Sequence, residues 1–436
     1  MKTPRIGIRR EDKNEWEARV PLIPKHVAQI VRHHGIDVTV QPSKIRAFPD
    51  QEYEAAGAEI SEDLSGCDVV FAVKEIPVEQ FVPGKTYIFF SHTIKGQKSN
   101  MPMLKLLMDR GCQLIDYEKI TDHVGRRLIF FGRYAGLVGM INSLWALGRR
   151  LKHEGFDTPF SELRQTYTYD DLNAARKEIV RVGGRIEKEG LPAELGPLVV
   201  GFAGYGNVGR GAQEIFDLLP FKRIAPGDLK PLMTSNGPPA NLLYKLVFKE
   251  EDMVEPVDPD HVFVLQDYYD RPERYRSKFE KYLPHLAVLV NAIYWDERYP
   301  RFVTQDYLEQ AHETGGLRLK VIGDVTCDVG GSIECNLRST DTGNPVYVYD
   351  PSARTATDGV QGRGVVVLAT DNLPCELPKE SSTAFSEVLI KFVPAIALAD
   401  ISGRVEESGV PDEIERAVIV WRGKLTKDFE NLRSHV

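Results

Sequence analysis

A glycine-rich turn between an apolar run and an amphipathic helix constrains the fold of this chain more than any other feature. The apolar run Leu198–Ala203 predicts a buried strand, and it leads directly into Gly204-Tyr205-Gly206-Asn207-Val208-Gly209. Apolar residues then recur at the spacing of one helix face, at Val208, Ala212, Ile215, Phe216 and Leu219. A strand, a G-x-G-x-x-G turn and a helix in this order predict a dinucleotide-binding α/β unit.

Each glycine of this turn has a physical role in holding a pyrophosphate. Gly204 permits the tight turn, Gly206 lets the backbone approach the phosphates, and Gly209 lets the helix pack close to the strand. The helix N-terminus, which begins with Asn207 and Val208, offers unpaired N–H groups and the positive end of the helix dipole. We therefore expect the whole turn to bind the cofactor.

The residues alone leave the choice between the two nicotinamide cofactors open. An acid about 20 residues after the turn would bind the ribose of NAD, and Asp228 stands near that distance, beyond the Pro226-Gly227 break. Lys222 and Arg223, which precede it, would suit the 2′-phosphate of NADPH. Either nicotinamide cofactor could therefore fit these residues.

The rest of the central segment predicts one insertion and three more strands. Residues 226–260 predict an extended insertion, since proline and glycine interrupt them repeatedly. Strands are expected at Val262–Leu265, Ala287–Asn291 and Lys320–Val325. The last of these runs into Asp324, Asp328 and a glycine pair. This pattern indicates either a site beside a nicotinamide ring or a glycine-rich turn with aspartates as turn formers.

The first third of the chain alternates short strands with helices, which predicts a parallel sheet. Helices are expected from Ile23 to His34, where apolar residues follow one helix face, and over Met101–Arg110; Gly35 and Gly111 end them. The expected strands are Arg5–Arg9, Ile36–Val40, Cys67–Val73, Tyr87–Ser91 and Gln113–Asp116.

Ionisable residues follow several of these strands. They are Arg9, Arg10, Glu17, Arg19, Lys74, His92 and Glu118. Ligands of open parallel sheets bind beyond the carboxyl ends of the strands, so a base, an acid and cations gathered there indicate catalysis. Any single one of them is more typical of a solvated loop charge, and only the set as a whole favours catalysis. A histidine such as His92 is as often a hydrogen-bonded core residue as a proton carrier.

Composition excludes several classes of protein. The chain has 436 residues, enough for two or three domains, and a net charge of −8, which argues against binding nucleic acid. Its apolar runs are too short to cross a membrane, and a charged N-terminus replaces a signal peptide, so we expect a cytoplasmic protein. Five cysteines without a Cys-x-x-Cys pair indicate structural thiols rather than disulfides or a metal site.

Seven segments, in order along nearly the whole chain, closely resemble lysine-ketoglutarate reductase, the L-lysine-forming saccharopine dehydrogenase and a relative of alanine dehydrogenase. They are Arg9–Leu22, Phe90–Lys95, Ile115–Lys119, Phe131–Gly136, Gly204–Val208, Asn291–Trp295 and Asp371–Pro374. The segment Pro226–Pro259 departs most from the family pattern.

The resemblance implies an α/β fold of two Rossmann-like domains with parallel sheets flanked by helices and an active-site cleft between them. A discontinuous substrate domain would comprise residues 1–136 and 378–436, and the dinucleotide-binding domain residues 137–377.

The same resemblance implies roles for single residues. Lys74 and His92 would be the acid/base pair, with Glu118 tuning Lys74. Arg19 and Arg127 would bind substrate carboxylates, assisted by Glu17. Asp328 would lie beside the nicotinamide, with Asp324 as the alternative and as a cofactor-binding residue.

The implied reaction is the NAD(P)H-dependent condensation of L-lysine with 2-oxoglutarate to saccharopine. From the resemblance, together with Lys222 and Arg223, we expect NADPH, with NADH as the alternative. Arginines suit substrates with several carboxylates because their planar forks bind them bidentately. Two alternatives are an amino-acid dehydrogenase that uses ammonia and a keto acid, and a cofactor-binding protein without turnover. The direction of the reaction and the oligomeric state, including a homo-oligomer, stay open.

Overall fold

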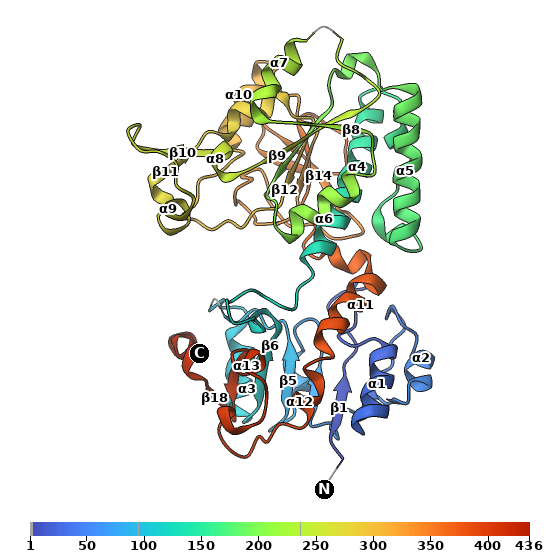
Figure 1. Ribbon diagram of the computed structural model, residues 1–436, viewed down its shortest axis with the longest axis vertical. Helices are drawn as coiled ribbons and strands as arrows, with labels where there is room; N and C mark the ends of the chain where they lie inside the picture. The colour runs from blue at the N-terminus through green and yellow to red at the C-terminus, as the bar shows by residue number, and fades with distance from the viewer. Residues whose placement is uncertain (1–2, 95, 236) are drawn as a thin grey trace. The chain divides into compact units, whose positions relative to one another are not determined.

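The chain folds into two compact units, one of which is discontinuous in sequence (Figure 1). The computed structural model describes residues 3–94, 96–235 and 237–436. Unit 1 comprises Met1–Phe131 and Pro378–Val436, and unit 2 comprises Gly132–Leu377. Lys95, at the end of one of the motifs above, lies outside the described residues.

Unit 1 is built on a sheet of eight strands among the described residues, in the order β18-β17-β6-β5-β4-β1-β2-β3. All neighbours from β6 to β3 are parallel, whereas β17 is antiparallel to β6 and β18 to β17. The strands are β1 (Arg5–Ile8), β2 (Asp37–Val40), β3 (Glu59–Ile60), β4 (Val69–Phe71), β5 (Thr86–Phe89), β6 (Gln113–Asp116), β17 (Val418–Trp421) and β18 (Lys424–Leu425).

Helices from both ends of the chain pack on this sheet. They are α1 (Pro24–His34), α2 (Asp50–Ala55), α3 (Met101–Asp109), α11 (Pro378–Leu389), α12 (Val393–Ala397) and α13 (Asp412–Glu415). Val27 and Ile30 of α1 are buried, and Gly35 ends the helix with a φ of 60°, a conformation that glycine adopts most easily.

Buried serines of α11 bind the loop between β1 and α1. The backbone N–H of Val20 donates to Ser382 Oγ at 2.9 Å, and that of Ile23 donates to Ser386 Oγ at 3.0 Å. The C-terminal segment therefore satisfies buried amides more than 360 positions earlier in the chain, which ties it into unit 1.

Unit 2 contains a second eight-stranded sheet within its described residues, in the order β15-β14-β16-β13-β12-β7-β9-β8. It is parallel from β16 to β8, with β14 and β15 antiparallel at one edge. Its strands are β7 (Val199–Ala203), β8 (Phe221–Ile224), β9 (Leu243–Phe248), β12 (Val288–Asn291), β13 (Val321–Asp324), β14 (Val346–Asp350), β15 (Thr355–Asp358) and β16 (Val365–Leu368). A separate pair joins β10 (Val254–Pro256) to β11 (Tyr275–Ser277).

Two helices of unit 2, α4 and α6, pack at close range because each has a glycine that faces the backbone of the other. A Cβ on Gly136 would lie 1.9 Å from Val208 O, and one on Gly211 would lie 2.2 Å from Arg133 O, so α4 and α6 pack without side chains between them at these points. The helices are α4 (Gly132–His153), α5 (Leu172–Glu189), α6 (Asn207–Phe216), α7 (Leu229–Thr234), α8 (Glu250–Met253), α9 (Leu265–Asp270) and α10 (Gln305–Glu313).

The α/β fold predicted from the sequence is confirmed, with three differences. Each sheet is mixed, because antiparallel strands extend one edge. Residues 226–260 are not an insertion: they contain β9, an inner strand that pairs with β7 on one side and with β8 on the other. Val262–Leu265 is not a strand, since Val262 is 83% exposed and Leu265 begins α9. No helix in the described parts of the chain is long and apolar enough to cross a bilayer.

Candidate functional site

The glycine-rich turn joins β7 to α6, and two of its glycines are required by backbone crowding. Gly204 has a φ of 105°, and a Cβ there would lie 2.5 Å from Ala292 O. A Cβ on Gly209 would lie 2.2 Å from Gly204 O. The turn and the first turn of α6 can therefore pack this closely only with glycine at both positions.

Gly206 is different, because space is open around it. It is the N-cap residue of α6, where no described side chain caps the helix, and a Cβ placed on it would meet nothing within 4 Å. The N–H groups at the start of α6, including those of Asn207 and Val208, face a site without a side chain in the way. This cradle fits a pyrophosphate bound at a helix N-terminus.

A pocket of about 320 Å³ adjoins this turn. Its lining includes Gly204, Tyr205 and Gly206 after β7, Glu250 after β9, and Ile293 after β12. These three strands are neighbours in the order β12-β7-β9, and the chain passes from one side of β7 to the other between β9 and β12. The pocket thus lies at the point of an open parallel sheet where ligands bind.

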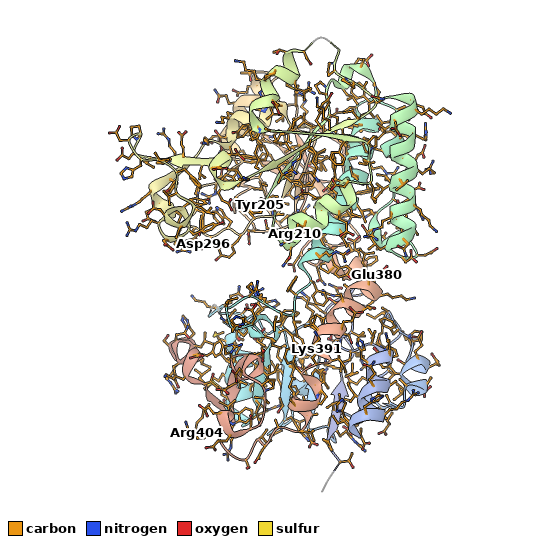
Figure 2. The ribbon with its side chains drawn as sticks, viewed as in Figure 1. Tyr205, Arg210, Asp296, Glu380, Lys391 and Arg404 are labelled. Atoms are coloured by element: carbon orange, nitrogen blue, oxygen red, sulfur yellow. The ribbon has the colours of Figure 1, made fainter. Side chains whose placement is uncertain are left out.

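Glu250 is the acid of this pocket, and the sequence analysis missed it. Tyr205 donates to Glu250 Oε2 at 2.8 Å and Tyr269 donates to Glu250 Oε1 at 2.7 Å (Figure 2 labels Tyr205). The signal that could have revealed Glu250 is the mostly apolar run Leu243–Phe248, which is typical of a strand and follows two prolines. Glu250 stands just beyond the end of this run. Lys222 and Arg223, expected near a 2′-phosphate, are exposed residues of β8 at the edge of the sheet.

The two aspartates after β13 have different surroundings. Asp324 is buried, and it accepts hydrogen bonds from Asn291 Nδ2 at 2.8 Å, Asn336 Nδ2 at 2.8 Å and Thr326 Oγ1 at 2.9 Å. Burial raises the pKa of Asp324 above its ordinary value, although these hydrogen bonds oppose the shift. Asp328 is only half-buried, in the turn that its carbonyl closes with Gly331 N–H at 2.9 Å.

In unit 1, the candidate residues follow four neighbouring parallel strands, β6, β5, β4 and β1. We call the ends of these strands the carboxyl edge of unit 1. Its members are Glu11, Glu17 and Arg19 after β1, Lys74 and Glu75 after β4, His92 after β5, and Glu118 and Arg127 after β6.

His92 is held by a carboxylate. Its Nδ1 lies 2.5 Å from Glu75 Oε1, and its carbonyl accepts from Asn100 Nδ2 at 3.0 Å. Its φ of 51° is unusual for a non-glycine residue. Burial raises the pKa of Glu75, but the hydrogen bond and charge of His92 outweigh it and lower the pKa to about 2. Glu75 follows Lys74 directly and was not singled out from the sequence.

Lys74 is half-buried, and its backbone is fixed by a second acid that the sequence analysis missed, Glu11. The two oxygens of Glu11 accept from Val73 N–H at 2.6 Å and Lys74 N–H at 2.9 Å. Burial, and then the charge of Glu17, raise the pKa of Glu11 to about 7. Glu11 therefore anchors the start of the loop that carries Lys74 and Glu75.

The two predicted arginines are in different environments. Arg19 is buried and donates to Glu17 from Nε at 2.8 Å and from Nη2 at 2.6 Å, with its guanidinium 4.2 Å from the centre of the Phe131 ring. Arg127 is half-exposed and lies 3.3 Å from Glu118 Oε1. Arg127 thus presents more of its guanidinium to a dissolved carboxylate than Arg19 does.

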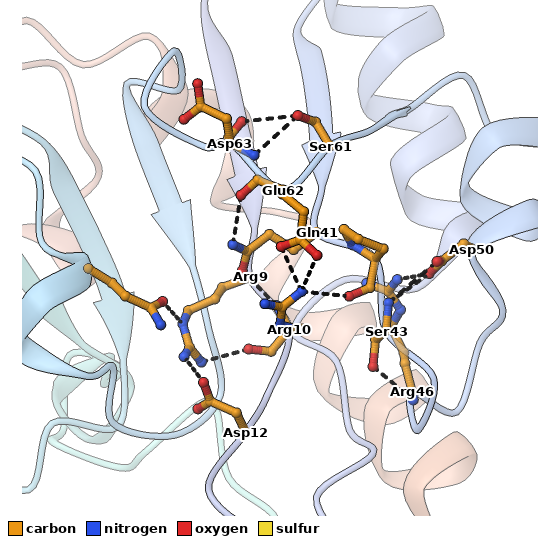
Figure 3. Close-up of polar contacts among 12 residues, drawn as sticks. Arg9, Arg10, Asp12, Gln41, Ser43, Arg46, Asp50, Ser61, Glu62 and Asp63 are labelled. Carbon is orange, nitrogen blue, oxygen red and sulfur yellow. Dashed lines mark hydrogen bonds and ion pairs between the residues drawn. The ribbon is translucent and has the colours of Figure 1, made fainter.

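Arg9 and Arg10 are held by groups of unit 1 itself (Figure 3). Arg9 donates to Asp12 at 2.5 Å and to Gln80 at 2.8 Å, and Arg10 binds Glu62 at 2.7 Å. These contacts fit a structural role for both arginines. Among the described residues, no group of three His, Cys, Asp or Glu side chains is arranged to hold a metal ion.

Comparisons with known proteins agree with this geometry. The chain matches two family models, "Alanine dehydrogenase/PNT, N-terminal domain" over residues 7–138 and "Alanine dehydrogenase/PNT, C-terminal domain" over residues 261–428. A solved structure titled L-alanine dehydrogenase superposes with a TM-score of 0.59 at 18% identity, covering 99% of both chains, which establishes the likeness of fold.

Two curated relatives extend the match. Alpha-aminoadipic semialdehyde synthase of Arabidopsis thaliana is 40% identical over 98% of this chain and 41% of its own length. Saccharopine dehydrogenase [NAD(+), L-lysine-forming] of Emericella nidulans is 28% identical over 89% of this chain and 91% of its own. The chain spans less than half the length of the first of these relatives. Together, the two family models and these relatives show that the chain belongs to the alanine dehydrogenase/PNT family.

Proposed function

We propose that this chain is an oxidoreductase that condenses L-lysine with 2-oxoglutarate to saccharopine, with a nicotinamide dinucleotide as the reductant. Unit 2 is the dinucleotide domain in this proposal, and unit 1 is the substrate domain. The observation that carries it is the carboxyl edge of unit 1, where a lysine, a carboxylate-held histidine and two arginine–glutamate pairs follow neighbouring strands. The 28% identity with the Emericella enzyme, over nine-tenths of both chains, supports this substrate pair.

The chemistry needs two proton carriers. The ε-nitrogen of lysine adds to the ketone carbon, water leaves to give an imine, and a hydride then adds to the imine carbon while nitrogen takes a proton. The bound dinucleotide supplies the hydride. With Nδ1 of His92 directed at Glu75, Nε2 is the atom that transfers protons to and from the carbinolamine oxygen or nitrogen. Lys74 is the second proton carrier.

The substrate carboxylates are bound by arginines in this proposal. Arg127 offers an accessible planar fork, while Arg19 and Glu17 form the buried part of the same subsite. Glu118 orients Arg127 and, by the family resemblance, tunes Lys74. Asp328, half-buried after β13, is the aspartate assigned to the nicotinamide, and Asp324 holds the turn before it.

The expectation of NADPH rests on the family resemblance and on Lys222 and Arg223, which lie on the edge strand β8 rather than beside the pocket. A cytoplasmic location stays a prediction of the sequence, and the oligomeric state stays open.

The deciding experiment is a steady-state assay of NADH and NADPH oxidation with two substrate pairs. We expect lysine with 2-oxoglutarate to support turnover and ammonia with pyruvate to support little. The reverse order would assign the chain to amino-acid dehydrogenases, and tight dinucleotide binding without turnover on either pair would indicate a non-catalytic protein.

A matched pair of variants tests the substrate subsite. Arg127→Ala should raise the KM for 2-oxoglutarate about tenfold or more, since a charge-assisted hydrogen bond is lost. Its neighbour Arg126, whose side chain is 78% exposed and pairs with Asp122, serves as the control. If Arg126→Ala and Arg127→Ala change the KM equally, Arg127 does not bind the substrate.

A further inference from the structure

The side chain of Glu11 binds the backbone at the point where the chain leaves β4. Just beyond that strand, the N–H of Ala72 donates to Ile88 O of β5 at 3.0 Å. The next two amides, those of Val73 and Lys74, donate to the two oxygens of Glu11 at 2.6 Å and 2.9 Å. One carboxylate from the loop after β1 therefore fixes the backbone of Lys74.

The charged form of Glu11 holds these two amides more strongly than the neutral form. A carboxylate accepts at both oxygens, whereas a protonated carboxyl group carries a donor on one of them. Hydrogen bonds to a charged acceptor are also about twice as strong as those to a neutral one. Glu11 is only 5% exposed, so little water reaches it to replace a weakened bond. Protonation of Glu11 thus loosens the backbone of Val73 and Lys74.

The ionisable neighbours of Glu11 are Glu17, Arg9 and Tyr117. Burial, and then the charge of Glu17, raise the pKa of Glu11 to about 7, although the two amides and the charge of Arg9 oppose the shift. Tyr117 is buried, and among the described residues no group bonds its hydroxyl. Burial, and then the charge of Glu11, raise the pKa of Tyr117 further above neutrality. Of these groups, Glu11 is the one whose charge changes near pH 7.

We propose that Glu11 is a positioning residue for Lys74, and that turnover requires Glu11 in its charged form. This inference rests on the proposed function, in which Lys74 is the second proton carrier. A displacement of about 1 Å at a reacting group can cost about 10²-fold in rate, so a looser backbone at Lys74 slows the chemical step. The contribution of Glu11 is complete well above pH 7 and is lost as the pH falls through about 7.

Amide hydrogen exchange of the full chain tests the anchor without any turnover. Glu11→Gln keeps the size of the side chain but replaces one acceptor oxygen by a donor, as protonation does. At pH 8, the peptide that contains Val73 and Lys74 should exchange at least about tenfold faster in this variant than in the parent, while the peptides of unit 2 stay unchanged. In the parent, the protection of the same peptide, corrected for the intrinsic pH dependence of exchange, should be lower at pH 6 than at pH 8.

Steady-state rates with lysine, 2-oxoglutarate and the reduced dinucleotide test the positioning. At pH 8, Glu11→Gln should lower kcat by about 10–10²-fold and leave the KM for 2-oxoglutarate within a few-fold of the parent. The ratio of kcat at pH 8 to kcat at pH 6 should be larger in the parent by up to about tenfold, because only the parent loses the charge of Glu11 between these values. Glu15→Gln, an exposed residue of the same loop, is the matched control and should behave like the parent in both experiments.

Each failure has a separate meaning. Unchanged exchange at Val73 and Lys74 in Glu11→Gln overturns the anchor and the proposal with it. A lower kcat with the ratio of the parent would show a merely structural role for Glu11, which also overturns the proposal. If the parent does not turn over lysine with 2-oxoglutarate at either pH, the proposed function and the charge requirement fail together, whereas faster exchange in Glu11→Gln would still show that Glu11 positions Lys74.

Discussion

His92 shows how a single residue is prepared for chemistry by its neighbours. Its left-handed backbone conformation and the carbonyl contact with Asn100 fix the residue, and Glu75 fixes the ring. Glu75 lies 17 residues before His92, and Asn100 lies 8 residues after it. A sequence pattern can indicate a histidine at a strand end, but it cannot reveal a partner that the fold brings in from the neighbouring strand.

We expect His92→Gln to lower kcat by about 10²–10⁴-fold, the usual contribution of a general acid or base, while dinucleotide binding stays unchanged. Glu75→Gln should lower kcat less and shift the pH–rate profile, because the imidazole loses the carboxylate that holds it. Lys13, which lies 3.3 Å from the other oxygen of Glu75, provides the control Lys13→Met, with little expected change. Rates for His92→Gln within a few-fold of the parent would remove this histidine from the mechanism.

Glu376 gives unit 2 a pH-dependent stability. It is buried, it accepts from Asn142 Nδ2 at 3.0 Å, and burial raises its pKa from 4.5 to about 7. Between pH 4.5 and about pH 7, the folded state therefore keeps a proton on Glu376 that the unfolded state has already released. The stability that this proton contributes is complete below about pH 4.5 and is lost as the pH rises to about 7.

Urea unfolding at pH 5 and pH 8 should show this effect. Between pH 5 and pH 8, the free energy of unfolding of the parent should fall by up to about 3 kcal/mol more than that of Glu376→Gln, because glutamine cannot ionise. Glu313→Gln, on the exposed face of α10, should behave like the parent. The same pH dependence in the parent and in Glu376→Gln would show that Glu376 titrates normally in the fold.

At the scale of elements, β7, the glycine turn and α6 could be predicted because a contiguous stretch contains all three signals. β9 could not, because prolines and a glycine precede its apolar run and Lys245 interrupts that run. Lys245 is buried there and its charge is paired with Asp217 at 2.5 Å, a contact that only the folded sheet provides. Without β9, the pattern gives no reason to single out Glu250. The apolar residues of Val262–Leu265 predict a strand, but Val262 and Val264 are exposed and form none.

The open space at Gly206 makes the turn testable by a single substitution. Gly206→Val should leave the thermal stability nearly unchanged, because its Cβ meets nothing and its φ is −71°, yet it should abolish dinucleotide binding by filling the phosphate cradle. Gly227→Val is the control, since Gly227 lies in the same unit with equally open surroundings. Fluorescence titration and a melting curve of each variant decide it; unchanged binding by Gly206→Val would place the pyrophosphate elsewhere.

At the scale of the whole molecule, the hydrogen bonds from the β1–α1 loop to α11 join the two ends of the chain. Ser382→Ala leaves the buried N–H of Val20 without its acceptor, which should destabilise unit 1 by about 1–3 kcal/mol. Within the described residues, the hydroxyl of Thr383 on the same helix donates to Lys379 O at 2.7 Å, in the preceding turn of that helix, so Thr383→Ala should cost less. Equal effects in urea unfolding would show that the serine does not tie the segments together.

The discontinuity of unit 1 has a consequence for biosynthesis. Translation completes all of Gly132–Leu377 before it reaches Pro378, so unit 2 can fold while the first segment of unit 1 still waits for its last helices and strands. Until β17 emerges, β6 is an open strand edge with unpaired backbone groups. The nascent chain is therefore most prone to aggregate late, when most of it has already been made.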